Sequence, residues 1–214
     1  PPFQAVISFP GAHALDVRSS ARLETQFFDF IIRSGRAVMH PMYKGTYERT
    51  IGGSFGAYMA QPNVWRELAV QWYKDLGRSI DYLETRPDID REKLAYQGLS
   101  LGATEGPKLM ALETRLKVGV LLWGGSWGRE EIPAEVDALH FAPRSRAPTL
   151  MVNGRHDFIF PLESSQAPLF RLLGTPEKDK RHFVVEGGHS PFNQEVVREA
   201  LAWLDRYLGP VRTR

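Results

Sequence analysis

Residues 93–106 read Lys-Leu-Ala-Tyr-Gln-Gly-Leu-Ser-Leu-Gly-Ala-Thr-Glu-Gly. The stretch joins a strand-like run at residues 94–96 to a helix-like segment at 103–113, with Gly98-Leu99-Ser100-Leu101-Gly102 between them. A G-x-S-x-G motif in this strand–turn–helix setting exposes its serine as a nucleophile. Glycines flank the serine because the turn is too crowded for a Cβ there. We therefore predict that Ser100 is a nucleophile and that the backbone N–H of Leu101, at the helix start, faces an oxyanion formed beside it.

Two other stretches match the same motif, Gly52-Gly53-Ser54-Phe55-Gly56 and Gly124-Gly125-Ser126-Trp127-Gly128. The first follows residues 46–50, which are too polar for a buried strand, and we interpret it as a loop. The second follows a convincing strand at 118–123, but Arg129-Glu130-Glu131-Ile132-Pro133 comes next, and an early proline disfavours a packed helix there. Ser126 therefore remains the alternative nucleophile, beside the possibility that the chain has none.

The composition describes an ordinary globular chain. Its 214 residues fit one domain, 1–214, with 43% hydrophobic and 24% charged residues and a net charge of +2. The charges are mixed along the chain, and the absence of a lysine or arginine run argues against nucleic acid as a partner. The sequence has no cysteine, which excludes disulfides, thiolate catalysis and cysteine-bound metal.

Targeting signals are not recognisable in this sequence. No apolar run approaches the roughly 18 residues that span a membrane, and no signal peptide precedes the first predicted strand. This favours the cytoplasm without deciding the compartment. The chain starts at Pro1-Pro2, directly before a strand, as expected of a processed protein or of a domain fused or docked to an N-terminal partner. The oligomeric state is left open.

Strand-like and helix-like segments alternate along the chain. Strands are predicted at residues 4–9, 36–41, 94–96, 117–123, 149–153 and 182–185. Helices are predicted at residues 21–34, 64–85, 103–113, 162–173 and 194–208. Loops are predicted at 43–62 and 124–148, the latter with one short helical piece at most, and a turn at 87–90. This alternation predicts an α/β fold, a mostly parallel sheet with helices on both faces.

The chemistry is expected where these strands end, because active sites of such sheets gather at the carboxyl ends of the strands. A serine needs a base to take its proton, and the base needs an acid to hold its tautomer. Ser100, Asp157 and His189 each follow a predicted strand and occur in the chain order Ser…Asp…His. We predict that they are the nucleophile, the acid and the base.

With these three residues in place, the sequence resembles the α/β-hydrolase superfamily, in particular its dienelactone-hydrolase-like and prolyl-oligopeptidase-like esterases. It is most similar to the hydrolase domains that follow bacterial serine/threonine kinase domains. The resemblance covers residues 4–208 and rests on Gly98-Leu99-Ser100-Leu101-Gly102, on the stretch Pro148 to Asp157, and on Gly187-Gly188-His189-Ser190. It implies a minimal α/β-hydrolase fold without a large lid and without a cofactor.

The resemblance also implies a second oxyanion donor in the loop after the first strand. Ala12 N–H is the best match, with Gly11 next. Two departures from the family pattern matter. Dienelactone hydrolases carry a cysteine where this chain has Ser100, and the two strands that normally precede the oxyanion-loop strand are missing here.

Each assignment has an alternative. Asp157 would also serve as a helix cap or turn residue, and Glu163 and Glu186 are then the next acids to consider. His189 would otherwise be a surface-loop histidine. For His13, contact with substrate and a scaffold role are both open.

Four side chains, His13, Tyr43, Trp123 and Trp127, are candidates for contact with substrate, although aromatic residues at strand ends are equally often core. The remaining histidines, His40, His140, His156 and His182, are interpreted as scaffold or surface. No histidine spacing suggests a metal site.

The function expected from the sequence is hydrolysis of small, accessible carboxylic esters through an acyl-enzyme, since residues 124–148 are too few for a lid domain. Two alternatives stay open: a peptidase of the prolyl-oligopeptidase type, and a catalytically silent fold that serves as a binding or regulatory module.

Overall fold

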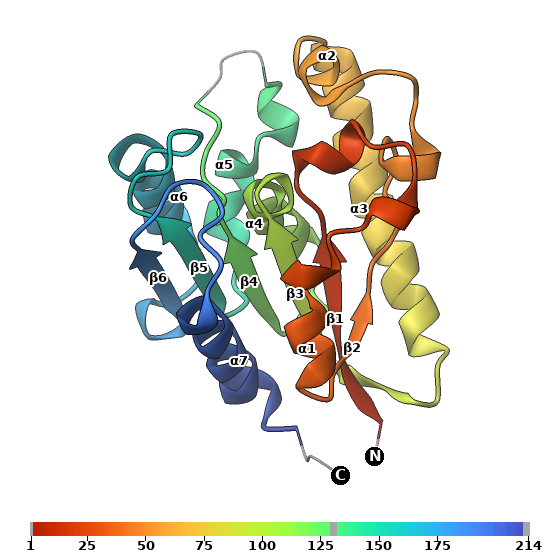
Figure 1. Ribbon diagram of the computed structural model, residues 1–214, viewed down its shortest axis with the longest axis vertical. Helices are drawn as coiled ribbons and strands as arrows, with labels where there is room; N and C mark the ends of the chain where they lie inside the picture. Colours follow the sequence, from red (N-terminus) through yellow and green to blue (C-terminus); the bar gives the residue numbers. More distant parts are fainter. Residues whose placement is uncertain (1, 129–131, 212–214) are drawn as a thin grey trace.

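A computed structural model describes residues 2–128 and 132–211, and its centre is a parallel sheet with the strand order β2-β1-β3-β4-β5-β6 (Figure 1). The strands are β1 (Phe3–Phe9), β2 (Ala37–Met39), β3 (Ile89–Leu99), β4 (Val118–Leu122), β5 (Thr149–Gly154) and β6 (Lys180–Val185). Every neighbouring pair is parallel. The chain adds β2 on one side of β1 and then β3 on the other, so the order reverses between β1 and β3. Ligand sites of open α/β sheets lie outside the carboxyl ends of the strands at such a reversal.

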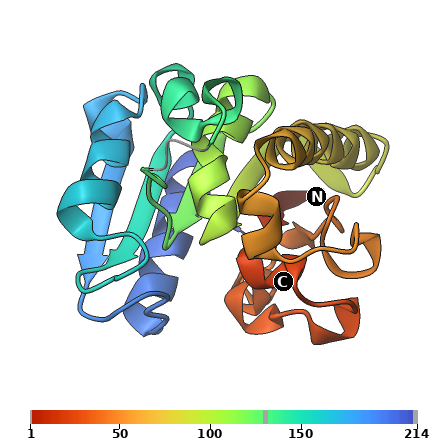
Figure 2. The same cartoon turned by 90° about the horizontal axis from the view of Figure 1, so that it is seen from above.

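Helices cover both faces of this sheet (Figure 2). They are α1 (Asp29–Arg33), α2 (Phe55–Met59), α3 (Pro62–Glu84), α4 (Leu101–Leu112), α5 (Ala138–Phe141), α6 (Ala167–Leu172) and α7 (Gln194–Leu208). Side chains of α3, α4 and α6 contribute to one buried cluster, and those of α1 and α7 to a second cluster across the sheet. The predicted fold class is confirmed.

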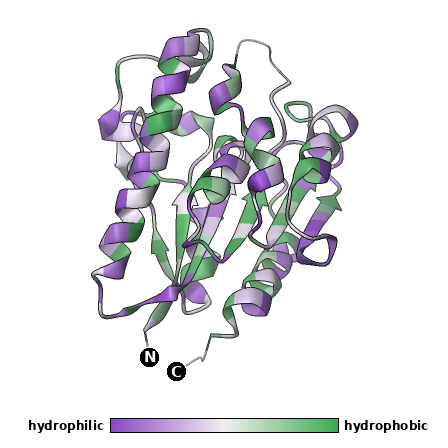
Figure 3. Cartoon of the chain, turned by 180° about the vertical axis from the view of Figure 1, so that it is seen from behind, coloured by the Kyte–Doolittle hydropathy of each residue, from purple (hydrophilic) through white to green (hydrophobic). Residues whose placement is uncertain are grey.

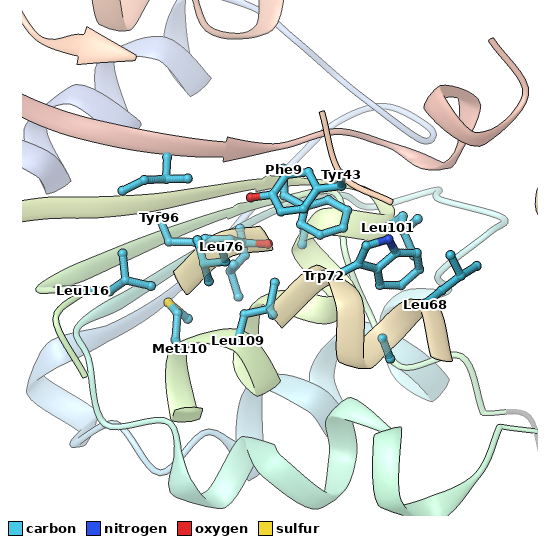
Figure 4. Close-up of a cluster of buried hydrophobic side chains, with 14 of the residues drawn as sticks. Phe9, Tyr43, Leu68, Trp72, Leu76, Tyr96, Leu101, Leu109, Met110 and Leu116 are labelled. Carbon is cyan, nitrogen blue, oxygen red and sulfur yellow. The ribbon is translucent and has the colours of Figure 1, made fainter. Parts of the chain in front are cut away.

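The two clusters follow from the alternation of side chains along each strand. In β1, Ile7 belongs to the α3–α4 side and Val6 to the α1–α7 side. Figure 3 shows the result as hydrophobic strands between helices that are hydrophilic on their outer faces. On the α3–α4 side, Trp72 of α3 meets Phe9 edge-on with 5.5 Å between ring centroids (Figure 4).

Buried polar contacts join the first strand to the last helix. Gln4 in β1 donates from Nε2 to the carbonyls of Leu208 and Gly209. Arg36, whose side chain is only 1% exposed, donates to Gln4 Oε1 and forms an ion pair with Asp205 of α7. The first two strands and α7 are therefore held at one polar cluster.

The segment predicted as one helix, 21–34, is different in the structure. Only α1 is α-helical, and it follows two 3₁₀ turns, Ser20–Arg22 and Thr25–Phe27. The reason is tertiary: Gln97 Nε2 of β3 donates to the carbonyl of Phe27 (2.8 Å) and removes that acceptor from a helical ladder.

Three further segments differ. Residues 43–62 contain α2 as well as loop. The residues predicted as a turn at 87–90 run directly into β3, because Phe3 pairs with Ile89 and donates to Asp88 O. The predicted helix 162–173 is split into a π-helical turn, Leu162–Gln166, and α6.

The 124–148 segment contains α5 between two 3₁₀ turns, Ala134–Val136 and Ala142–Arg144. Residues 129–131, on which part of the sequence argument about Ser126 rested, lie outside the described residues. Within 2–128 and 132–211, no helix has the length and apolarity required to cross a membrane.

Candidate active site

Ser100 occupies the sharp turn between β3 and α4, with φ 50° and ψ −103°. A serine rarely adopts positive φ, so the surrounding structure must hold the backbone there. The flanking glycines explain how the turn fits. A Cβ on Gly98 would lie 2.3 Å from the carbonyl oxygen of Gly102, and one on Gly102 would lie 2.5 Å from that of Phe9. The backbones meet too closely for any other residue.

The loop after β1 runs beside this turn. Gly102 N–H donates to Pro10 O (3.2 Å), and a Cβ on Gly11 would be 3.6 Å from Ser100 Cβ. Among the described residues, neither Ala12 N–H nor Leu101 N–H has a hydrogen-bond acceptor. Two free amide donors beside a serine are suited to hold an oxyanion.

His189 lies within hydrogen-bond distance of both Ser100 and Asp157. His189 Nε2 is 3.0 Å from Ser100 Oγ, and His189 Nδ1 is 2.8 Å from Asp157 Oδ2. The Asp157 side chain is fully buried, whereas that of His189 is 16% exposed. The geometry supplies a route for a proton from the hydroxyl to the imidazole and a carboxylate to stabilise the resulting imidazolium.

The loop after β5 fixes the carboxylate of Asp157. Its Oδ1 accepts from the backbone N–H groups of Ile159 (2.8 Å) and Phe160 (3.0 Å), which leaves Oδ2 for His189. The Phe160 ring also packs against the His189 imidazole, with 5.9 Å between centroids.

Behind this loop, fully buried Gln166 donates from Nε2 to Gly154 O (3.0 Å) and Phe160 O (2.7 Å). Phe160 and Gln166 were not predicted from the sequence. A glutamine inside a predicted helix carries no signal of such a contact.

The loop of His189 lies directly against the loop after β5, residues 155–160, which carries Asp157 and is called the acid loop below. His156 N–H donates to Gly187 O (2.9 Å), and a Cβ on Gly154 would meet Gly188 O at 2.0 Å. Gly187 has φ 141°, which an L side chain rarely adopts. These glycines allow the ends of β5 and β6 to approach closely enough for the histidine to reach the acid.

The serines of the other two motif matches have structural contacts. Ser54 caps α2, its Oγ accepting from Ala57 N–H. Ser126 is buried and its carbonyl accepts from Ser165 Oγ (2.7 Å). No described histidine is bonded to either hydroxyl.

The fallback acids lie elsewhere. Glu186 is exposed and bonds to Arg155 and His156, and the hydrogen bond from Arg155 lowers its pKa. Glu163 lies in the π-helical turn before α6. Neither has a contact with His189 among the described residues.

Of the other histidines, His13 Nε2 lies 2.9 Å from Glu24 Oε2, without hydrogen-bond geometry. Burial lowers the pKa of His40 to about 4, and nearby His13 adds to the shift. His40 stacks on Phe28, in keeping with a scaffold role. Burial likewise lowers the pKa of His182 to about 4. His140 and His156 are exposed.

The aromatic candidates for substrate contact separate into two groups. Tyr43 is fully buried and stacks on Phe9 at 4.0 Å, and Trp123 is 1% exposed. Both are core residues, so the expectation that they line a pocket is corrected. Trp127 is half-buried and packs on Phe160, 4.8 Å between centroids, on the side of the site where His189 lies.

Within the described parts of the chain, no three histidine, aspartate or glutamate side chains are placed to hold a metal ion. A cavity of about 280 Å³ lies away from the site, lined by residues of β2, of the end of α3 and of the connection from α3 to β3, among them Met39, Tyr82 and Arg86. None of the three residues Ser100, Asp157 and His189 lines it.

No protein-family model matches the sequence. None of the curated proteins matches it either. Solved structures do match. TT1662 from Thermus thermophilus has a TM-score of 0.72 at 18% identity, over 97% of this chain and 90% of that protein. A cold-adapted esterase from an Arctic intertidal metagenomic library has a TM-score of 0.72 at 23% identity, over 97% and 84%.

Further similar structures include a dienelactone-hydrolase-like protein and an acylaminoacyl peptidase, the latter at TM-score 0.69 and 13% identity. The chain has the α/β-hydrolase fold. This chain covers all but a small part of the esterase yet only 38% of the acylaminoacyl peptidase. The turn at Ser100 joins a strand to a helix, as G-x-S-x-G turns of the α/β-hydrolase fold do.

Proposed function

We propose that this chain is a serine hydrolase that cleaves small carboxylic esters through an acyl-enzyme. The observation that carries the proposal is the continuous contact from Ser100 Oγ through His189 to the buried carboxylate of Asp157. The strained turn that presents Ser100 supports it further, because backbone strain of this kind clusters at active sites.

In the proposed reaction, Ser100 Oγ attacks the ester carbonyl carbon while His189 Nε2 takes the hydroxyl proton. Asp157 accepts the Nδ1–H of His189, which fixes the tautomer with Nε2 free and stabilises the imidazolium. The tetrahedral intermediate collapses, the C–O bond to the alcohol breaks, and His189 returns the proton to the departing oxygen. Water then attacks the acyl-serine by the same route and releases the acid.

The negative oxygen of the tetrahedral intermediate is held by two backbone donors, Ala12 N–H and Leu101 N–H. Their position beside Ser100 and their lack of other acceptors among the described residues support this assignment. The positive end of the α4 dipole adds to the field at the same point. Such donors act without reorganisation because they belong to the fixed backbone.

Small esters are the substrate class that we favour. Similar structures include an esterase of 23% identity and acetyl xylan esterase 1 from Thermoanaerobacterium sp. JW/SL YS485 at 15% identity. The chain itself uses no cofactor in this proposal. His13 and Trp127 are proposed to contact substrate from the two sides of Ser100.

The test combines a fluorophosphonate probe with hydrolysis of short-chain aryl esters. Wild-type protein and Ser126→Ala should label and turn over equally, whereas Ser100→Ala should do neither. We expect the rate to fall by about 10⁴–10⁶-fold on loss of Ser100. Labelling that persists in Ser100→Ala but disappears in Ser126→Ala would assign the reaction to the other turn.

Two other outcomes would contradict the proposal and favour one of the alternative functions. Folded wild-type protein that is neither labelled nor active would indicate a silent binding module. Hydrolysis of a dipeptide amide as fast as of an ester would indicate a peptidase.

A further inference from the structure

Gln166 is a buried polar residue that the proposed reaction does not use directly. It lies in the π-helical turn Leu162–Gln166, which follows the loop that carries Asp157. Its side chain is 0% exposed, and its two amide hydrogens have two different acceptors. The amide oxygen has no partner among the described residues. The hydrogen bonds of Gln166 are therefore made by its two amide N–H groups and not by its amide oxygen.

The two acceptors are the two ends of the acid loop. Gly154 O closes β5 and Phe160 O ends the loop, at 3.0 and 2.7 Å from Gln166 Nε2. Asp157 lies midway between them. One side chain thus sets the separation of the two loop ends, in the way that a cross-link would.

The second acceptor connects Gln166 to the carboxylate. Phe160 accepts from Gln166 with its carbonyl and donates its own N–H to Asp157 Oδ1. With Ile159 N–H on the same oxygen, the carboxylate can rotate little, and Oδ2 faces His189. The position of Phe160 also fixes its ring, which packs on the His189 imidazole.

From these contacts we infer that Gln166 is a positioning residue of the acid–base pair, one that orients Asp157 and His189 through the Phe160 backbone. The inference rests on the proposed function. It predicts a catalytic effect from a residue whose side-chain hydrogen bonds go only to Gly154 and Phe160.

The main test is Gln166→Met, which keeps the length of the side chain and removes both donors. Displacement of a catalytic group by an ångström or less costs up to about 100-fold in rate, so we expect kcat for an aryl ester to fall about 10- to 100-fold with KM nearly unchanged. A less firmly held carboxylate stabilises the imidazolium less. The midpoint of the pH–rate profile should therefore move to lower pH.

A matched control is available at the opposite end of β5. Thr175 is also buried, and its hydroxyl also contacts two carbonyls, those of Ser145 (3.3 Å) and Ala147 (2.8 Å). Thr175→Val should lower the free energy of unfolding without moving the pH–rate midpoint. Gln166→Leu, which also lacks both donors and introduces no charge, should show the same loss of kcat and the same shift of the midpoint, and it covers the case in which Gln166→Met does not fold.

The inference is overturned if the Gln166 variants keep the wild-type kcat and pH–rate midpoint, or lose activity only in proportion to the unfolded fraction as Thr175→Val does. The proposed function has its own, separate test in Ser100→Ala. If Ser100 proves inert, NMR titration of His189, assigned with His189→Gln, still decides the role of Gln166: a shifted midpoint in Gln166→Met supports it and an unchanged one refutes it.

Discussion

Replacing Ser100 by glycine and by alanine separates backbone strain from chemistry. Both variants lose the hydroxyl and its contact with His189, so this loss cancels when they are compared. Alanine keeps the Cβ at φ 50° and ψ −103°, whereas glycine has no such restriction. A non-glycine residue in a sparsely populated region costs about 1–3 kcal/mol. Against this gain, glycine lowers the stability by about 0.4–1 kcal/mol because it raises the entropy of the unfolded chain.

The difference predicts that Ser100→Gly is more stable than Ser100→Ala by about 1–2 kcal/mol. For a chain of this size, that is roughly 2–8 °C in Tm. Thermal unfolding followed by circular dichroism measures it, and both variants should be inactive. At a site without backbone strain, the alanine variant would instead be the more stable of the two.

Gly77 provides the comparison, because it lies within α3 and a Cβ there has no neighbour within 4 Å. Gly77→Ala should raise the free energy of unfolding by about 0.5–1 kcal/mol. If Ser100→Ala equals or exceeds Ser100→Gly in stability while Gly77→Ala behaves as expected, the turn at Ser100 is not strained.

Three further predictions concern packing and charge. Gly102→Ala places a Cβ 2.5 Å from the carbonyl oxygen of Phe9 and should both destabilise the protein and reduce ester hydrolysis, as measured by Tm and kcat; normal values for both would contradict it. Glu105 and Lys108 form a buried ion pair in α4. Loss of either partner alone, in Glu105→Gln or Lys108→Met, should lower the free energy of unfolding in urea by about 3–5 kcal/mol, whereas the double variant should be about as stable as wild type. If the two single losses add in the double variant, the residues are not coupled. Burial lowers the pKa of His182 to about 4, so below its ordinary value of about 6.5 the unfolded chain binds a proton that the folded protein does not. The free energy of unfolding should therefore fall as the pH drops from 6.5 to 4. His182→Gln should remove part of this dependence on pH.

The strands and the chain order Ser…Asp…His were predictable because they depend on local pattern. The apolar runs that became β4 and β5 need no tertiary information, and α7 occurs at the predicted residues 194–208. Ser100 could be preferred over Ser126 from sequence because the segment after it has helical character. The contacts of these side chains in space match what strand ends in a parallel sheet impose.

The departures arise from contacts between residues far apart in the chain. The helix predicted at 21–34 is interrupted because Gln97, about seventy residues later, takes the carbonyl of Phe27. Tyr43 was a candidate for substrate contact, but its ring lies against Phe9 in the core. Gln166 had no signal at all, since its role depends on two carbonyls that come together only after β5 and the acid loop are folded.

The cluster of Gln4, Arg36 and Asp205 has a consequence for the order of synthesis. Asp205 follows Arg36 by 169 residues, and ribosomes add about 5–20 residues per second, so Arg36 waits roughly 10–30 s for its carboxylate. A buried guanidinium without that partner is costly, so Arg36 gains its full set of contacts only when α7 packs against the sheet. The polar cluster at this edge of the sheet is therefore completed only after α7 has been synthesised.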